Sequence, residues 1–212
     1  DDIARYKRDK EFNERIVPRL GANGQLEDCM SKDIRVGDII RVNRIEEIPC
    51  DILVLKSSDP KGVAYVMTAN LDGETDLKLK KSVAATQSLD DSELAAHHGA
   101  VVCLPPNQDI HKFDSYYVHH ANMSVKSPGD LDELRDIPTD ELVALGIGNA
   151  MWQATHVKNC DWVLGMALYT GMETRVGCNR KPAETKWCQT DKFINRIAII
   201  IFAFQLAVSC IF

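Results

Sequence analysis

Residues 37–67 read GDIIRVNRIEEIPCDILVLKSSDPKGVAYVM and indicate the fold more clearly than the rest of the chain. Three short apolar runs, at 39–42, 51–55 and 63–67, are separated by segments that contain Gly, Pro and Asp. Closely spaced runs of this kind, bounded by turn residues, are typical of an antiparallel β-sandwich or jelly roll. We therefore predict a mainly β domain, a distorted jelly roll or β-sandwich, with flanking helices.

The segments on either side extend this prediction along the chain. Residues 1–15 carry many charges of both signs and predict a solvated helix, whereas Pro18, Gly21 and Gly24 indicate a turn or hairpin in residues 16–25. Further predictions are a polar, helix-tolerant segment at 82–98, strands at 101–104 and 162–169, and an acidic surface loop or insertion at 126–141.

Composition excludes several classes of function. The chain has 212 residues and a hydrophobic content of 45%, which is ordinary for a globular protein. Its formal net charge of −6 provides no basic excess for phosphates, so no nucleic-acid partner is predicted. The seven cysteines form no C-x-x-C pair, and neither histidine doublet has the spacing of a metal site. We predict a reduced compartment, no disulfide framework and no metal site.

The carboxyl-terminal run, residues 197–212, contains no charged side chain. It is slightly shorter than the roughly 20 apolar residues that a membrane-spanning helix needs. A buried terminal helix is one interpretation. We prefer the start of a truncated transmembrane helix, because the run is apolar on every face and because Lys192 and Arg196 precede it, as at a cytosolic border.

One segment carries the residue types of a reactive site. Residues 68–78 read TANLDGETDLK and place three carboxylates at alternating positions around a glycine, directly after a predicted strand. Taken alone, Asp72-Gly73-Glu74-Thr75 is usually a turn with charged neighbours. Its spacing does not fit a calcium-binding EF-hand loop. The tetrapeptide therefore needs its context before it indicates a function.

That context resembles a known family. Residues 35–40, 48–55 and 71–75 follow one another as in the actuator domain of P-type ATPases. Cation pumps of this superfamily usually carry Thr-Gly-Glu at the loop, whereas Asp72-Gly73-Glu74-Thr75 is similar to the form typical of P4-type ATPases, the phospholipid flippases. Further residues that look like the flippase pattern are 2–6, Asn13, Leu77-Lys78, 159–165 and 169–171.

The resemblance implies a catalytic role for the loop. P-type pumps form an aspartyl phosphate, and its hydrolysis needs a carboxylate that positions the attacking water and accepts its proton. We predict Glu74 as this base and Gly73 as the residue that lets the backbone approach the phosphorylated site. Asp72 is predicted to shape the loop and to contact that site. Thr75 belongs to the same segment, with a structural role.

The resemblance also implies a larger parent protein. The Asp-Lys-Thr-Gly motif of the phosphorylated aspartate does not occur in the chain. The phosphorylation and nucleotide domains, which bind Mg²⁺ and ATP, are therefore expected downstream of residue 212, and no cofactor site is predicted within the chain. The predicted divisions are a membrane-proximal helical linker at 1–15, an actuator domain at 16–177 with a loop or insertion near 82–150, a linker at 178–196 and the truncated helix at 197–212.

The leading prediction is the domain that dephosphorylates the aspartyl phosphate while a phospholipid moves from the exoplasmic to the cytosolic leaflet. The chain alone is not expected to hydrolyse ATP. Expected partners are the phospholipid, the membrane, the parent's phosphorylation domain and an accessory β-subunit, and the region would face the cytosol as part of an integral membrane protein.

Two alternatives stay open. One is the actuator domain of a cation-transporting P-type ATPase, against which Asp72 in place of threonine argues. The other is a non-enzymatic β-sandwich interaction module with a carboxyl-terminal membrane anchor. That module would explain the strands but gives no reason for residues 72–75.

Overall fold

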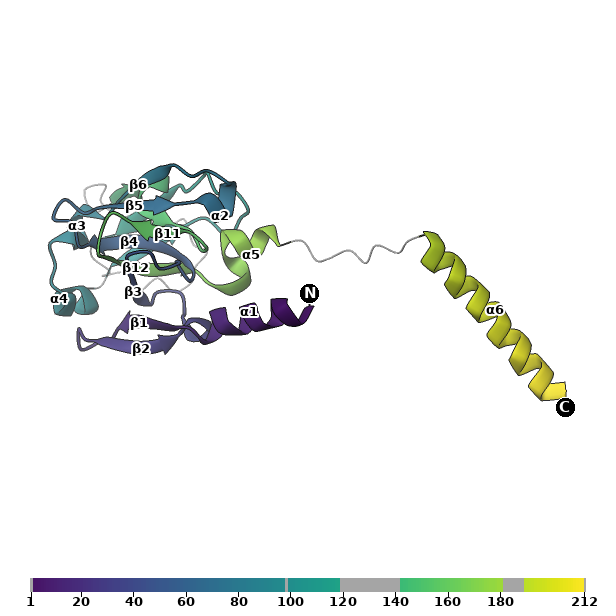
Figure 1. The fold of residues 1–212 in the computed structure, drawn as a ribbon. Coiled ribbons are helices and arrows are strands. Elements are labelled where there is room, and N and C mark those ends of the chain that lie inside the picture. Colours follow the sequence, from purple (N-terminus) through teal and green to yellow (C-terminus); the bar gives the residue numbers. More distant parts are fainter. Residues whose placement is uncertain (1, 98, 119–141, 181–188, 212) are drawn as a thin grey trace. The chain divides into compact units, whose positions relative to one another are not determined.

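The computed structural model describes residues 2–97, 99–118, 142–180 and 189–211, which belong to two compact units with a boundary after Arg180. The first unit contains the described strands (Figure 1). In chain order they are β1 (Ile16–Leu20), β2 (Leu26–Met30), β3 (Ile39–Asn43), β4 (Asp51–Ser57), β5 (Val63–Met67), β6 (Leu77–Lys81), β7 (Ala100–Cys103), β8 (Ser115–Val118), β9 (Leu142–Leu145), β10 (Ala150–Met151), β11 (His156–Lys158) and β12 (Trp162–Tyr169).

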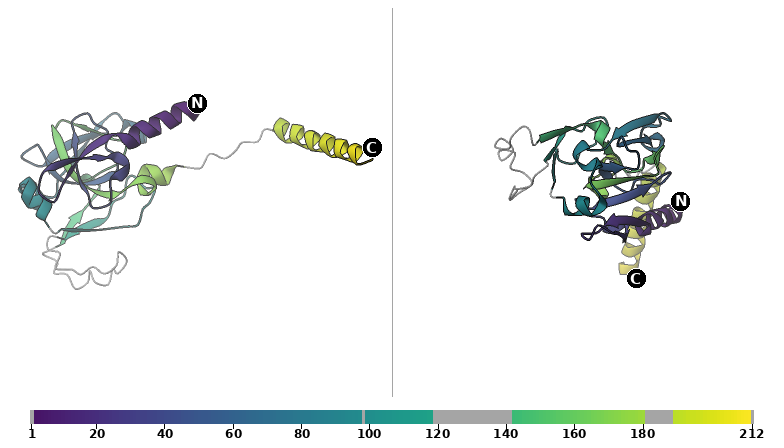
Figure 2. Two further views of the ribbon diagram at one scale, coloured as in Figure 1. Left: turned by 90° about the horizontal axis from the view of Figure 1, so that it is seen from below. Right: turned by 90° about the vertical axis from the view of Figure 1, so that its left-hand side faces the viewer.

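These strands form three antiparallel sheets. The central sheet has the order β10-β4-β12-β3-β1-β2, and the two smaller sheets have the orders β11-β5-β6 and β7-β8-β9. The purple ribbon in Figure 1 and Figure 2 runs from helix α1 (Asp2–Glu14) into the β1–β2 hairpin at one edge of the central sheet. The other helical segments of this unit are α2 (Ala69–Asp72), α3 (Ala84–Gln87), α4 (Asp91–Ala96), α5 (Arg175–Asn179), η1 (Ser31–Asp33), η3 (Ile147–Asn149) and η4 (Gly171–Glu173).

The strands β4 and β12 of the central sheet are buried on both faces, and β4 shows why its sequence is almost continuously apolar. Successive side chains of a strand point to opposite faces. Ile52 and Val54 therefore join one core cluster, and Leu53 and Leu55 join the other. A strand between two cores needs apolar side chains at every position, so the alternation of a half-exposed strand is absent.

Each core has a different partner layer. On one face, side chains of the central sheet pack with Val66 of β5 and Val157 of β11. On the other face, they pack with Leu94 of α4, Tyr117 of β8 and Leu145 of β9. The first unit is therefore a stack of β layers with short helices on one side, as the mainly β prediction requires.

A close contact between β4 and β12 depends on a glycine. A Cβ atom built on Gly165 would lie 2.6 Å from Cδ1 of Ile52 and 3.0 Å from its Cβ. The pairing of β12 with β4 also shifts register between Leu164 and Gly165. The missing side chain lets the two central strands approach at this irregularity.

Most of the predicted elements are confirmed. The runs at 39–42, 51–55 and 63–67 are β3, β4 and β5, those at 101–104 and 162–169 are β7 and β12, and the predicted helix at 1–15 is α1. The hairpin at 16–25 is the start of the β1–β2 pair. The acidic segment 126–141 lies outside the described residues, and the described parts of 82–150 contain α3, α4, β7, β8 and β9.

The second unit contains helix α6 (Gln189–Ile211), which begins upstream of the apolar run predicted at 197–212. Across the part of the chain that the structure describes, no helix combines the length and the apolar character needed to cross a membrane. The assignment of 197–212 as the start of a membrane helix stays a prediction, as do the domain limits at 177 and 196.

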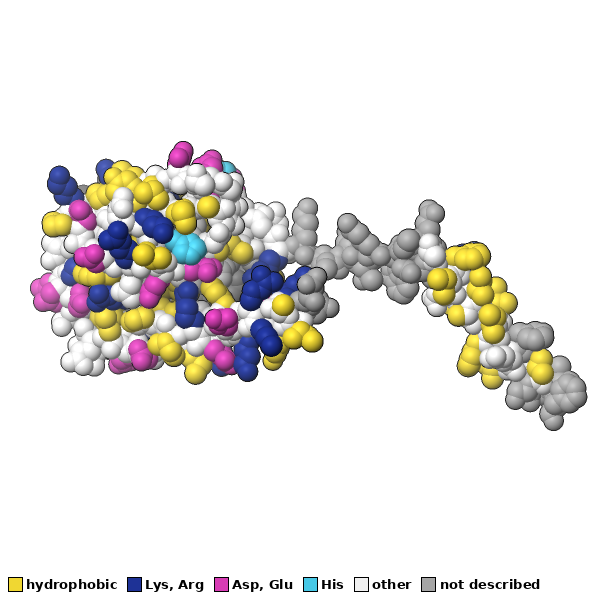
Figure 3. Space-filling model, viewed as in Figure 1, with side chains coloured by type: hydrophobic (Ala, Val, Ile, Leu, Met, Phe, Trp, Pro, Cys, Tyr) yellow, Lys and Arg dark blue, Asp and Glu magenta, His cyan; other side chains and the backbone are white. Residues whose placement is uncertain are grey.

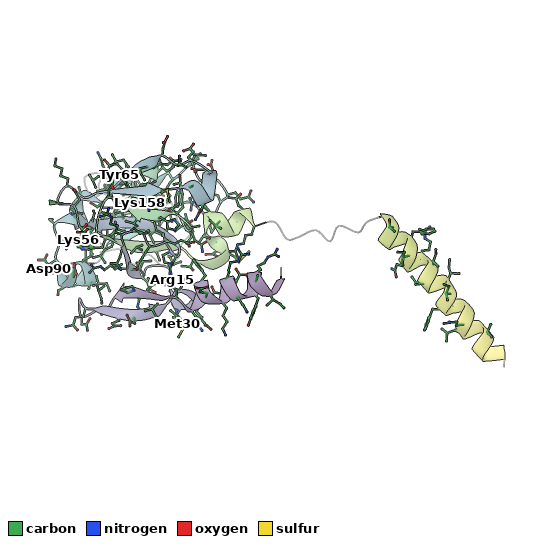
Figure 4. All side chains as sticks on the ribbon, viewed as in Figure 1. Arg15, Met30, Lys56, Tyr65, Asp90 and Lys158 are labelled. Carbon is green, nitrogen blue, oxygen red and sulfur yellow. The ribbon has the colours of Figure 1, made fainter. Side chains whose placement is uncertain are left out.

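The outer face of the β11-β5-β6 sheet is apolar and partly exposed. In register, Met67 pairs with Leu77, and Tyr65 pairs with Leu79 on one side and with Lys158 on the other. Figure 4 labels Tyr65 and Lys158 on this sheet, and Figure 3 shows apolar side chains gathered over β5 and β6. Since side chains alternate along β6, its lysines at 78 and 80 belong to the opposite face.

Candidate functional site

Residues 68–78 connect β5 to β6 through a single helical turn and a tight bend. Helix α2 ends at Gly73, which has φ 78° and ψ 0°, in the left-handed region. Glycine is the usual residue at this position after a helix, because a side chain there would be strained. A Cβ atom on Gly73 would meet no atom within 4 Å, so the backbone conformation requires the glycine and the surface around it is open.

Asp72 faces its own loop. Its side chain is 9% exposed. The Thr68 hydroxyl donates to its two carboxylate oxygens at 2.9 and 3.0 Å, and the Glu74 backbone N–H donates to Oδ1 at 3.0 Å. Lys78 Nζ donates to Oδ2 at 2.6 Å. Burial would raise the pKa of Asp72, but these donors, Lys78 foremost, lower it to about 2.

Glu74 has the opposite environment. Its side chain is 58% exposed, and the contact that the structure gives its carboxylate is Lys78 Nζ, 2.7 Å from Oε2. Lys78 therefore bridges the carboxylates of Asp72 and Glu74 with one ammonium group. Its hydrogen bonds to Asp72 and then to Glu74 raise its pKa above the ordinary value. Among the predicted site residues 72–75, Glu74 is the one whose carboxylate is exposed to solvent.

Thr75 is exposed and lies between Glu74 and the start of β6. The predicted segment 72–75 is thus one loop, in which Asp72 and Gly73 fix the conformation and Glu74 and Thr75 face solvent. The contact of Asp72 with a phosphorylated site stays a prediction.

Sequence reasoning gave no role to two lysines beside this loop. Lys78 is the bridge described above. Lys80, on the same face of β6, is buried, and its ammonium donates to the Ile147 carbonyl at 2.7 Å. Burial and the nearby Lys78 lower the pKa of Lys80 to about 8. The signal in the sequence is the alternation of Leu77, Lys78, Leu79 and Lys80, which predicts a strand but not which face is buried.

A buried ion pair was also missed. Arg175 lies at the start of α5 and Asp51 at the start of β4, and the structure brings them together. The Arg175 guanidinium also lies over the rings of Trp152 and Tyr169, at 4.3 and 4.6 Å from their centroids. Such contacts stabilise a cation that has left water. This cluster attaches α5 to the central sheet and is separate from the loop.

No metal centre is found in the described ranges, because they hold no group of three or more His, Cys, Asp or Glu side chains placed to bind an ion. The feature of the loop that suits acid–base chemistry is the exposed Glu74 carboxylate, which the Lys78 ammonium holds.

Comparisons with known proteins identify the family of this chain. Residues 11–126 match the family described as the P-type ATPase actuator domain. Phospholipid-transporting ATPase 2 of Arabidopsis thaliana is 36% identical over 98% of this chain and 17% of its own length. Phospholipid-transporting ATPase DRS2 of Saccharomyces cerevisiae is 35% identical over 95% of this chain and 14% of its own length. Phospholipid-transporting ATPase FetA of Mus musculus is 30% identical over 96% of this chain and 16% of its own length.

A solved structure of a zinc-transporting PIB-type ATPase in its E2.Pi state aligns with 93% of this chain and 22% of its own, at 14% identity and a TM-score of 0.43. The chain spans 14–17% of the length of the three phospholipid-transporting relatives named above. The predicted family is confirmed by the match over residues 11–126. This chain belongs to the P-type ATPase actuator-domain family.

Proposed function

We propose that this chain is the actuator domain of a phospholipid-transporting P-type ATPase and that Glu74 acts in hydrolysis of the parent protein's aspartyl phosphate. The observation that carries the proposal is the contrast within one loop. Asp72 is enclosed and bonded to its neighbours, whereas the Glu74 carboxylate is exposed and held by Lys78. The names of the relatives favour a phospholipid over a cation as the transported substrate.

The proposed step is hydrolysis of an acyl phosphate. The oxygen of a water molecule attacks phosphorus in line and forms a new P–O bond, while the bond from phosphorus to the aspartate oxygen breaks. The products are the free aspartate carboxylate and inorganic phosphate. Glu74 orients the water and accepts its proton, which then passes to solvent. Glu74 suits this role because its carboxylate is accessible to a second domain, and Asp72 does not because its oxygens are already bonded.

The remaining parts of the activity belong to the rest of the parent protein. The proposal places the phosphorylated aspartate, ATP and Mg²⁺ in domains outside this chain. It makes the parent an integral membrane protein whose actuator domain faces the cytosol and whose substrate moves towards the cytosolic leaflet. An accessory subunit would contact other parts of the parent.

The test uses the full-length parent, as wild type and as Glu74→Gln. Each protein is phosphorylated with radioactive ATP and then chased with unlabelled ATP and phospholipid vesicles. We expect a hydroxylamine-sensitive phosphoenzyme that decays promptly in the wild type and persists in Glu74→Gln. The matched control is Asp76→Asn, which removes an exposed carboxylate from the same loop and should decay like the wild type. Prompt decay in Glu74→Gln would refute the proposal.

A further inference from the structure

We propose that Lys78 is a positioning residue for dephosphorylation, which orients the Glu74 carboxylate and offsets the negative charge of the loop. This inference rests on the proposed function of Glu74. It concerns a residue beyond the tetrapeptide 72–75, to which the resemblance itself assigns no role.

The geometry forms a continuous chain of contacts from the fold to Glu74. The Thr68 hydroxyl and the Glu74 N–H fix the Asp72 carboxylate, and Asp72 Oδ2 lies 2.6 Å from Lys78 Nζ. The same Nζ lies 2.7 Å from Glu74 Oε2. Glu74 is thus held by one oxygen, which leaves Oε1 as the oxygen that can receive the attacking water.

An exposed glutamate needs such a support. A solvent-exposed Glu side chain samples several rotamers, and ordering it for catalysis costs entropy. An isolated exposed pair at i and i+4 orders it weakly. Here the ammonium is itself held by Asp72, whose side chain is almost enclosed and hydrogen-bonded within the loop, so Glu74 is connected to a well-anchored carboxylate.

Charge gives a second reason. Asp72 and Glu74 would approach a phosphoryl group that is itself anionic, and like charges at short range repel. Lys78 supplies a positive charge between these two carboxylates. Lys80 does not replace it, because the Lys80 ammonium is buried and donates to the Ile147 carbonyl.

The experiment compares Lys78→Met, Lys78→Arg and Lys81→Met with the wild type in the full-length parent. Lys81 is the matched control, since it is an exposed lysine at the end of the same strand and on its other face. We expect the phosphoenzyme to decay about tenfold to a hundredfold more slowly in Lys78→Met, because misplaced catalytic groups lose rate on this scale. Lys78→Arg should decay faster than Lys78→Met but more slowly than the wild type, and Lys81→Met should decay at the wild-type rate. Wild-type decay in Lys78→Met would overturn the inference.

A second comparison separates positioning from a general effect on the loop. If Lys78 acts mainly through Glu74, then adding Lys78→Met to Glu74→Gln should slow decay much less than Lys78→Met slows the wild type. Multiplied effects of the two changes would instead mean that Lys78 acts elsewhere, and the inference would fail. If Glu74→Gln alone decays promptly, the proposed function fails first, whatever Lys78 does.

Formation of the phosphoenzyme from ATP serves as the test of folding. If Lys78→Met forms no phosphoenzyme, the double variant Asp72→Asn with Lys78→Met takes its place. The double variant removes both charges, so the enclosed Asp72 carboxylate is not left without its cation. It should show the same slow decay. Wild-type decay in a correctly phosphorylated double variant would again contradict a positioning role for Lys78.

Discussion

The Arg175 guanidinium lies 3.6 Å from the Asp51 carboxylate, and the two side chains are 1% and 0% exposed. The backbone N–H groups of Arg175 and Gln153 also donate to Asp51, at 2.8 and 2.9 Å. Burial raises the pKa of Asp51, and these donors oppose that effect. Asp51 begins β4 and Arg175 begins α5, so one ion pair attaches the last helix of the first unit to its central sheet.

Breaking this pair from one side should destabilise the domain strongly. Arg175→Met leaves a buried carboxylate without its cation, and changes of this type cost about 3–5 kcal/mol. Urea unfolding followed by tryptophan fluorescence would measure the loss. The control is Arg180→Met, an exposed arginine in the same region, with an expected change within about 0.5 kcal/mol. Equal stabilities of the two variants would contradict this account.

Acid should weaken the loop through Asp72. Its pKa is about 2 in the folded chain, below the value of about 3.9 for a free aspartate, so the unfolded chain binds the proton more readily. The stabilising contribution is therefore complete above about pH 4 and is lost as the pH falls towards 2. We expect the unfolding free energy of Asp72→Asn to depend less on pH in this range than that of the wild type, whereas Asp76→Asn should behave like the wild type. Equal slopes for the wild type and Asp72→Asn would contradict the prediction.

The contact between β4 and β12 should be sensitive to one methyl group. Gly165→Ala places a Cβ against Ile52 and overpacks the core, at a cost of about 1–3 kcal/mol. Ile52→Val removes the nearest atom, Cδ1. The double variant should therefore be less destabilised than the sum of the two single variants, as measured by urea unfolding. Additive losses would mean that the strands do not meet closely at this point.

The sequence predicted the central strands and the reactive loop for different reasons. β4 and β12 are apolar at nearly every position because two cores cover them, and such runs are recognisable in a sequence. The loop was identified by its tetrapeptide and the order of its neighbours. Its catalytic role remains a proposal, although the family is shown by the comparison over residues 11–126.

The partners of the lysines could not be predicted in the same way. Along β6, apolar and basic residues alternate, and the ordinary expectation is that leucines are buried and lysines are exposed. The structure has Leu77 and Leu79 exposed and Lys80 buried. The reason is a carbonyl acceptor at Ile147, far along the chain, for the ammonium of Lys80. Asp51 and Arg175 are likewise far apart in sequence, so no local sequence pattern predicts their contact.

Gly73 gives the last prediction, because its structural and functional roles can be separated with a second glycine. Gly37 also has a positive φ, 94°, and a Cβ on either residue would meet no atom within 4 Å. Alanine at each site should therefore cost a similar amount of stability, about 1 kcal/mol, through backbone strain alone. In the full-length parent, only Gly73→Ala should slow decay of the phosphoenzyme, since only this loop approaches the phosphoryl group in the proposed mechanism. Equal decay rates in Gly73→Ala and Gly37→Ala, at equal stability, would mean that Gly73 serves the turn and not the reaction.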